Sequence, residues 1–409
     1  MALDNTWIKE VEESFGRLEN YCGQEEYKGW DPYDGLNSKI FGAVPFLKNI
    51  ELARLVWIQL FKKAPINLRK PFLVPKGYNS KGIALFLSGY CNLLKYQRNA
   101  NTEAFGSEKE LIKKVDYLAK LLVSLRSNIS SQNSCWGYNF DWQSKAFYLP
   151  RSTPTIVATS FGIEALLRAY SITRNEKYLN HALSAAEFIK NDLNRIPKKE
   201  GFMFSYSPLD NQAVYNATLL ATRSLSHIYE ITKEKICKEL AFLSARAVCD
   251  LQNADGSFPH SDQVGNRWRD NFHTAFKLES LSSYQQKCSD NTFKKNIEVG
   301  FNYWFNHFFD HASGKAYYYD TPGKLVDLHC AAQAIPTFYH LGKFKEYEDF
   351  INLMSGWAIT NMQDKYGFFY FQKRGNRVVK IPYMRWPNAW MLYGMSFYLL
   401  SHSTDEKNT

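Results

Sequence analysis

Apolar positions along the chain follow two helical patterns that alternate. In the first pattern, apolar residues three or four apart form a single stripe, which predicts a helix with one buried face. The clearest stripe is Leu111, Val115, Leu118, Leu122 and Leu125, with a capping box at Ser107 and Glu110 ahead of it. In the second pattern, apolar and small residues cover most sides of the helix. Neighbours must then cover it on every side.

The second pattern recurs at a nearly constant interval. Helices of this kind are expected to begin near Thr155, Ala213, Asp270, Asp327 and Trp386, which are about 57 to 59 residues apart. An earlier member is expected over residues 81–98. A short segment rich in glycine and aromatic residues precedes each of the five, at 135–138, 201–206, 255–258, 314–319 and 366–370. Such a fixed period indicates a repeat architecture.

One-sided helices are expected between the repeats, at 111–125, 178–189 and 236–247, with a further outer helix at 46–62. Six helices of each kind predict an all-α fold, an (α/α)6 barrel whose six inner helices are wrapped by six outer ones. The glycine–aromatic segments would form short hairpins or loops at one mouth. We predict a single toroid domain over 1–401 and a polar, frayed tail over 402–409. An open α-solenoid is the alternative.

The composition adds one point to this picture, which is the class of binding partner that the protein favours. Trp 10, Tyr 26 and Phe 29 make 16% of the chain aromatic, and the net charge is +10. A positive field favours anionic partners. The basic residues are dispersed, with no run of five, and no RRM, KH or helix-turn-helix pattern occurs, so we expect no nucleic-acid partner.

The cysteines and the start of the chain bear on its compartment. The seven cysteines are odd in number and show no CxxC spacing, so we expect buried thiols instead of disulfides or a zinc ribbon. The first ten residues contain no apolar stretch, and no apolar run reaches about 18 residues, so neither a signal peptide nor a transmembrane segment is expected. These features predict a cytoplasmic protein.

Ionisable and aromatic residues gather just ahead of the predicted inner helices. The catalytic candidates are His273, His329, Tyr206, Tyr319, Asp270 and Asp327. Asp270 and Asp327 also suit the N-cap position. One histidine at a helix start is commonly a structural residue, but two at equivalent places favour a function. A metal held by these histidines and an aspartate is a weaker alternative, and we expect no metal and no cofactor.

A larger set of residues is suited to binding a sugar. Arginine forms two-pronged hydrogen bonds to carboxylates, and aromatic rings stack on sugar faces. The candidates are Tyr33, Asp34, Asn37, Arg69, Trp136, Tyr138, Asp141, Arg151, Asp255, His260, Trp268, Arg269, Arg374, Arg385 and Trp386. An aromatic cleft with arginines predicts an acidic oligo- or polysaccharide as the partner.

Three kinds of activity fit such a cleft. We favour proton abstraction, as in a polysaccharide lyase or a uronate C5-epimerase, in which a Tyr or His removes the proton and an Arg, Asn or His neutralises the sugar carboxylate. Glycoside hydrolysis would need two carboxylates flanking the bond. The aspartates available for it are Asp34, Asp141, Asp255, Asp270 and Asp327. A non-catalytic glycan-binding or assembly protein is the third reading.

Three segments together resemble a known family. They are GWDPYDGLNS at 29–38, PINLR at 65–69 and KGIALF at 81–86. They resemble the VpsJ-like proteins of bacterial polysaccharide biosynthesis, and the resemblance runs through most of the chain. It implies a toroid fold and a role in making or modifying a capsular polysaccharide or exopolysaccharide. The positions it marks are Asp31, Tyr33, Asp34, Asn37, Asn67, Arg69 and Lys81.

A second, local resemblance is weaker. Residues 252–258, QNADGSF, are similar to the repeat motif of triterpene cyclases, whose folds are also helical toroids. The chain has no aspartate cluster able to protonate an alkene. We therefore expect this motif to form a turn between an outer and an inner helix.

Overall fold

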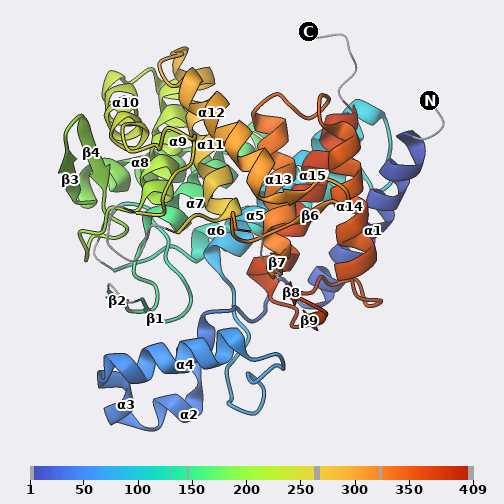
Figure 1. The fold of residues 1–409 in the computed structure, drawn as a ribbon, viewed down its shortest axis with the longest axis horizontal. Helices are drawn as coiled ribbons and strands as arrows, with labels where there is room; N and C mark the ends of the chain where they lie inside the picture. The colour runs from blue at the N-terminus through green and yellow to red at the C-terminus, as the bar shows by residue number, and fades with distance from the viewer. Residues whose placement is uncertain (1–3, 130, 145–146, 262–267, 322–324, 404–409) are drawn as a thin grey trace.

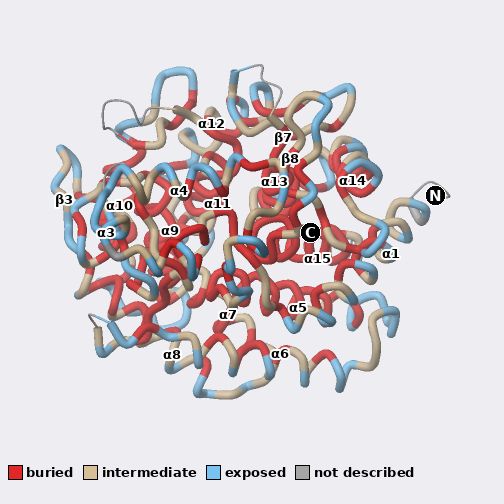
Figure 2. Tube along the Cα trace, turned by 90° about the horizontal axis from the view of Figure 1, so that it is seen from below, coloured by how far each residue is buried: buried red, intermediate tan, exposed pale blue. Residues whose placement is uncertain are grey.

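The computed structural model describes residues 4–129, 131–144, 147–261, 268–321 and 325–403. In this part of the chain, helices form two concentric rings (Figures 1 and 2). The inner ring is α5 (Ser80–Ala100), α7 (Ile156–Thr173), α9 (Tyr215–Thr232), α11 (Asn271–Cys288), α13 (Leu328–His340) and α15 (Ala389–Ser403). The outer ring is α1 (Asp4–Gln24), α6 (Glu108–Ser124), α8 (Glu176–Glu187), α10 (Lys235–Cys249), α12 (Lys294–His307) and α14 (Glu348–Met362). The predicted (α/α)6 barrel is confirmed.

The ring is closed, because its first and last units pack against each other. Inner helix α15 contacts α5, and outer helix α1 contacts α14. Asn92 of α5 donates to Ser396 of α15 at 3.1 Å, and Ser14 of α1 donates to Gln363 at 2.9 Å. An open solenoid would leave these faces exposed, so that alternative is excluded.

The starts of the inner helices are held at one end of the barrel, which we call the mouth. The first backbone N–H of four of them donates to a carbonyl in the connecting segment of the next unit. These bonds join Ile156 to Tyr206, Tyr215 to His260, Asn271 to Tyr318 and Leu328 to Phe371, at 2.9 to 3.3 Å. Because helix N-termini carry partial positive charge, the mouth is electropositive before any side chain is counted.

The periodic glycines have a structural cause. Gly201, Gly256, Gly314 and Gly367 all have positive φ, between 73° and 101°. Each also lies against the backbone of the next outer helix, where a Cβ would overlap it. For Gly367 that helix is α1, so the same contact also closes the ring. Only glycine combines this conformation with this close approach.

Short antiparallel pairs occur where hairpins were expected. They are β1 (Trp142–Gln143) with β2 (Tyr148–Leu149), β3 (Arg195–Lys198) with β4 (Gly201–Phe204), β5 (Phe309–Asp310) with β6 (Lys315–Ala316), and the sheet β7 (Leu325–Asp327), β8 (Gln372–Arg374), β9 (Arg377–Val379). The β7–β8 pairing joins the last two units. The π-helical turn η3 (Met384–Asn388) leads from this sheet into α15.

The predicted outer helix at 46–62 is wrong in its position. These residues belong to a lobe, residues 31–79, that stands apart from the rings (Figure 1). The lobe contains the turn η1 (Asp34–Asn37) and helices α2 (Lys39–Gly42), α3 (Pro45–Asn49) and α4 (Glu51–Lys63). Ile58 of α4 packs on Leu36 and Phe41 of the lobe. An apolar stripe shows that one face is buried but does not say against what, and α1 takes the outer position instead.

Three smaller expectations can also be compared with the described chain. The seven cysteines are free and buried, as expected. The predicted tail begins too early, because α15 continues to Ser403 and the His402 ring lies 2.8 Å from Glu348; residues 404–409 lie outside the described residues. Within the described residues, none of the helices combines the length and apolar character needed to cross a membrane.

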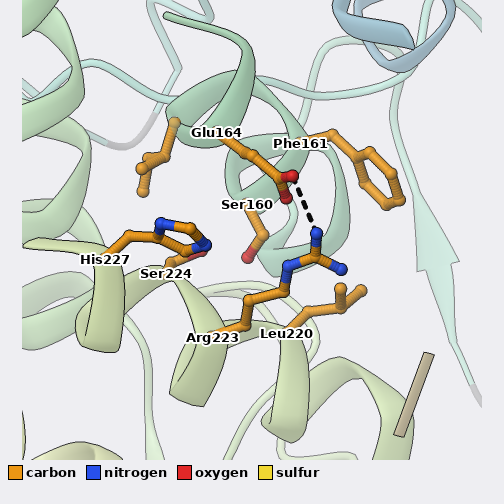
Figure 3. Close-up of a pocket in the computed structure, with 8 residues that line it drawn as sticks. Ser160, Phe161, Glu164, Leu220, Arg223, Ser224 and His227 are labelled. Atoms are coloured by element: carbon orange, nitrogen blue, oxygen red, sulfur yellow. Dashed lines mark hydrogen bonds and ion pairs between the residues drawn. The ribbon is translucent and has the colours of Figure 1, made fainter. Parts of the chain in front are cut away.

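A buried polar cluster, the axial network, joins all six inner helices below the mouth. Its members are Asn92, Glu164, Arg168, Arg223, Glu279, Gln333, Thr337 and Ser396. Arg223 bonds Glu279 at 2.6 Å and Glu164 at 2.7 Å, the latter pair being drawn in Figure 3. Arg168 bonds Glu164 and Asn92, each at 2.9 Å, while Gln333 and Thr337 donate to Glu279. The network lies about two helical turns below the helix starts.

Replacing Arg223 with Met is expected to destabilise the protein by about 3–5 kcal/mol, because Glu279 would remain buried without its partner charge. Chemical denaturation would measure this loss. Arg98→Met is the matched control, since the Arg98–Glu108 pair is exposed and its loss should change stability little. Equal stability of the two variants would contradict a structural role for the network.

Candidate active site at the mouth

Four basic side chains meet at the centre of the mouth. Lys81 lies in the first turn of α5, His273 in that of α11 and His329 in that of α13, while Arg385 lies in η3. The Phe272 ring touches both imidazoles, with centroids 4.3 Å from His273 and 4.2 Å from His329. The charges of Lys81, His273 and Arg385 all act on His329. The structure therefore brings together side chains that are far apart in the sequence.

Asp270 and His273 form a hydrogen-bonded dyad. Asp270 caps α11: its Oδ1 accepts the His273 N–H at 2.9 Å and its Oδ2 lies 2.7 Å from His273 Nδ1. Burial would raise the pKa of Asp270, but the interactions with His273 outweigh it and the pKa lies below its ordinary value. The ionised aspartate orients the half-buried imidazole and directs its Nε2 away from the cap.

His329 is the most deeply buried of these histidines, with 1% of its surface exposed. It lies between the rings of Phe272 and Trp390, the latter at 4.3 Å, and neither ring nitrogen has a hydrogen-bond partner among the described residues. Burial, together with the charge of Lys81, lowers its pKa well below the ordinary value. The side chain is therefore a neutral imidazole at pH 7.

Lys81 is a buried amine without an ion-pair partner among the described residues. Its Nζ lies over the rings of Phe161, Phe276 and Trp390, at 4.3, 5.0 and 5.2 Å. Burial and then the charge of Arg385 lower its pKa well below 10.5. Ring faces attract a cation but do not neutralise it. A negative charge reaching the mouth would meet this amine.

A continuous aromatic wall leads from the second unit to His329. Trp142 lies 5.5 Å from Tyr206 and 6.4 Å from Tyr33, and Trp386 lies 5.8 Å from Tyr33 and 4.9 Å from His329. The hydroxyls along the wall are paired: Tyr206 with Tyr138 at 3.2 Å, and Tyr33 with Lys62 at 2.9 Å. Such a wall can stack against a sugar ring.

Asp327 serves mainly to fix the wall and its histidine. It caps α13 through the His329 N–H at 3.0 Å, and it accepts bonds from Trp386 Nε1 at 2.9 Å and Gln372 Nε2 at 2.6 Å. Burial raises its pKa to about 6 in spite of these bonds. Both of its oxygens are occupied by protein donors.

One buried ion pair attaches the lobe to the mouth, and a second lies within the lobe. Arg385 donates from Nη2 to Asp31 at 2.8 Å, and Arg69 donates from Nε to Asp34 at 2.7 Å. Arg69 also lies against the Tyr383 ring at 4.6 Å. Arg69 and Asp34, predicted as substrate-binding residues, are therefore committed to each other inside the lobe.

The remaining predicted residues lie at varied distances from this centre. His260 stacks on Trp268 at 4.1 Å beside His273. Tyr319 is 41% exposed and pairs by its backbone with Asp270.

Other predicted residues are paired with protein groups. Arg269 bonds Asp320, and Arg374 bonds Gln372 at 2.8 Å. Asn37 bonds the Asn139 carbonyl at 2.9 Å, and Asp141 accepts the Arg151 N–H at 2.7 Å. Asp255 closes its own turn through Ser257, as the motif at 252–258 predicted.

Trp136 is placed away from the mouth surface. Its indole is fully buried against Gly162, and its N–H donates to the Leu122 carbonyl at 2.8 Å. It fills the interface between α6 and α7. Several rings of the glycine–aromatic segments, including Phe258 and Phe369, are buried in the same core. Only part of the aromatic excess therefore reaches the mouth.

One group in the described chain has the composition of a metal site. Ligand atoms of His260, Asp270 and His273 all lie within 4.8 Å of one another. The Asp270–His273 contact is 2.7 Å, which is the length of a hydrogen bond and shorter than the separation of two ligands on one tetrahedral zinc ion. The arrangement suits a proton-transfer dyad better than a metal centre.

The list of candidates drawn from the sequence lacked three residues of the mouth. Lys81 and Asp31 lay in segments that the family resemblance marked, and Lys62 lay in the helix that was assigned to the outer ring. A lysine inside an otherwise apolar helix start was the available signal for Lys81. Nothing in the sequence showed that Lys62 would approach Tyr33, because the lobe had not been recognised.

No family model and no curated protein matches this sequence. Several solved structures share its fold. An unsaturated glucuronyl hydrolase specific for heparin matches with a TM-score of 0.61 at 12% identity, over 99% of this chain and 100% of the other. Cellobiose 2-epimerase from Bacillus thermoamylovorans matches with a TM-score of 0.59 at 11% identity, over 80% and 90%.

A third match is an inactive variant of an α-1,6-mannanase of Salegentibacter, in complex with α-1,6-mannotriose. It has a TM-score of 0.56 at 14% identity, over 79% of this chain and 90% of the other. Two consecutive aspartates were changed to asparagine in that variant. At these identities the likeness establishes the α/α toroid fold.

The neutral, buried histidines make a prediction about stability. Burial lowers the pKa of His260 to about 3 and that of His329 well below 6.5, whereas both take up a proton near pH 6.5 once unfolded. The free energy of unfolding should therefore fall as the pH drops below about 6.5. His329→Leu should reduce this slope by up to about 1.4 kcal/mol per pH unit, measured by denaturation between pH 7 and 5. The exposed His311, replaced in the same way, should leave the slope in place.

Proposed function

We propose that this protein is a carbohydrate-active enzyme that abstracts a proton from an acidic sugar. The observation that carries the proposal is the grouping at the mouth of a neutral His329 with free nitrogens, an Asp270-oriented His273 and an unpaired Lys81. General acid–base catalysis needs two groups able to exchange protons near neutral pH, and carbanion formation needs a nearby positive charge. The two histidines are the candidates for proton transfer, with His329 as a weak base because of its lowered pKa, and Lys81 is the candidate for the positive charge.

The reaction follows from these roles. One histidine removes the proton from the carbon next to the sugar carboxylate, and the electron pair left behind spreads onto the carboxylate oxygens. Lys81 and Arg385 stabilise that added negative charge in a site with little water. The second histidine, which must hold a proton when the step begins, gives it to the other face of the carbon, which is epimerisation, or to the departing glycosidic oxygen, which is lyase cleavage. The two histidines then exchange protons with solvent before the next turnover.

Tyr206 and Tyr319 have smaller roles in this scheme than we expected. Burial and the neighbouring Tyr138 raise the pKa of Tyr206 well above 10, so its hydroxyl is a poor base and a better hydrogen-bonding contact. Tyr319 stands at the exposed edge of the mouth, beside Trp268 at 6.4 Å. Both suit binding of the sugar along the aromatic wall.

Glycoside hydrolysis is the second candidate, and the fold supports it as well, since two of the structures compared above are named as glycoside-cleaving enzymes. The chain, however, has no two consecutive aspartates like those changed in the inactive mannanase. Asp270 and Asp327 are both helix caps whose oxygens accept protein hydrogen bonds. Neither is free to act as a nucleophile, which places hydrolysis after proton abstraction.

The biological setting rests on the sequence resemblance alone. We propose a role in making or modifying a bacterial capsular polysaccharide or exopolysaccharide, carried out in the cytoplasm by the toroid and its lobe acting as one domain. The net charge of +10 and the cationic centre of the mouth support an acidic glycan or its precursor as substrate.

Incubating the enzyme with uronate-containing oligosaccharides in deuterated water should place deuterium at C5 or produce an unsaturated uronate. His329→Gln and His273→Gln are each expected to lower the rate by about 10²–10⁴-fold, since each removes one proton-transfer group. Mass spectrometry and NMR would follow the label. His311→Gln, an exposed position, is the matched control, and unchanged rates in both mouth variants would remove the proposal.

Lys81→Met should lower kcat by at least about tenfold on uronate-containing substrates, with a smaller effect on KM, because the positive charge matters most when negative charge develops. Steady-state kinetics on one substrate would separate the two constants. Lys95→Met, in the same helix but well below the mouth, serves as the control. A change in KM alone would assign Lys81 to ground-state binding and contradict the stated role.

A further inference from the structure

Exposed apolar side chains are concentrated in the lobe. Eighteen large hydrophobic side chains are exposed in the described part of the chain, and eight of them lie between residues 40 and 73, less than a tenth of the sequence. They are Ile40, Phe46, Ile50, Leu52, Val56, Leu60, Ile66 and Leu73. Single exposed apolar residues are ordinary, but a concentration of this kind marks an interaction surface.

Helix α4 is apolar on two opposite sides. On one side Trp57, Ile58 and Phe61 pack into the lobe, and Arg54 on the same side donates to Gln143 of the barrel at 2.8 Å. On the other side Leu52, Val56 and Leu60, spaced four apart, form a ridge with 69, 59 and 45% of their surfaces exposed. At about 100° per residue, this ridge points away from the buried side and from the barrel.

The lobe that carries the ridge is rich in exposed lysines. Lys39, Lys48, Lys63 and Lys70 are exposed in the lobe, and Glu51 is the exposed acidic residue among positions 39–70. Lys63 follows Leu60 on the ridge side of α4. An exposed apolar helical face in a surface region of net positive charge is suited to lie in the interface of an anionic bilayer.

We infer that the lobe docks on an anionic lipid surface, with the Leu52–Val56–Leu60 ridge inserted among the acyl chains and the lysines at the headgroups. The exposed lysines argue against a protein partner or a second copy of the chain as the occupant, because lysine is depleted in protein interfaces. The lobe is tied to the mouth by the Asp31–Arg385 pair and by the contact of Arg69 with the Tyr383 ring. Docking would therefore hold the mouth close to the lipid surface, whatever reaction it catalyses.

Sedimentation of the full-length protein with lipid vesicles tests the inference. Binding is expected to vesicles of phosphatidylcholine mixed with phosphatidylglycerol, to weaken as salt is added, and to be much weaker with phosphatidylcholine alone. The variant Leu52→Ser/Val56→Ser/Leu60→Ser should bind at least about tenfold more weakly, because it loses the inserted apolar surface. Replacing Lys39, Lys48, Lys63 and Lys70 with Gln should cost roughly fivefold per lysine.

Matched controls separate the lobe from general surface effects. Leu209→Ser/Ile231→Ser/Leu353→Ser removes three exposed apolar side chains elsewhere, and Lys199, Lys233, Lys235 and Lys295 replaced with Gln remove the same charge elsewhere. Both controls should bind as the unmodified protein does, and circular dichroism should show that every variant is folded.

Several results would overturn the inference. They are absence of binding to the anionic vesicles, equal binding to both lipid compositions, or equal losses in the lobe and control variants. A further contradicting result would come from light scattering. If the unmodified protein is a dimer and the ridge variant is a monomer, a second copy of the chain covers the ridge.

Discussion

The Arg and Glu side chains deep among the inner helices are buried together because they pair with one another. The axial network does this around Arg223, which bonds Glu164 of α7 and Glu279 of α11, and its bonds reach all six inner helices. Buried ion pairs give little net stability, but an incomplete set is costly. The closed ring is the arrangement in which every member keeps its partners, and the helix starts are aligned at the mouth as a consequence.

The chemistry of the mouth depends on that alignment. Because the inner helices begin at one level, the caps Asp270 and Asp327 and the basic residues Lys81, His273 and His329 come within reach of one another. The surrounding rings then remove water, which keeps His329 neutral and lowers the pKa of Lys81, an amine without an ion pair among the described residues. Neither property belongs to these residues alone, since both result from the aromatic packing between the units.

The lobe shows how a local pattern can mislead. The stripe over 46–62 was a correct sign of an amphipathic helix, but its apolar residues serve a small cluster of the lobe and an exposed ridge. The outer helix of that unit is α1, where Val11, Phe15, Leu18 and Cys22 carry the expected spacing and are buried. The spacing of apolar residues shows which side of a helix is buried. Which element packs against that side depends on the tertiary structure.

The sequence by itself determined the repeat, the helix types, the capping aspartates and the glycines, because each follows from local periodicity or backbone conformation. It also identified His273 and His329, since equivalent places in a repeat become neighbours when a ring closes. Only the tertiary structure decided that Arg69 and Asp34 pair with each other, that Trp136 is core, and that Lys81 and Lys62 belong to the mouth. These depend on which side chains meet across the ring, and such contacts between residues distant in sequence leave no periodic trace in the chain.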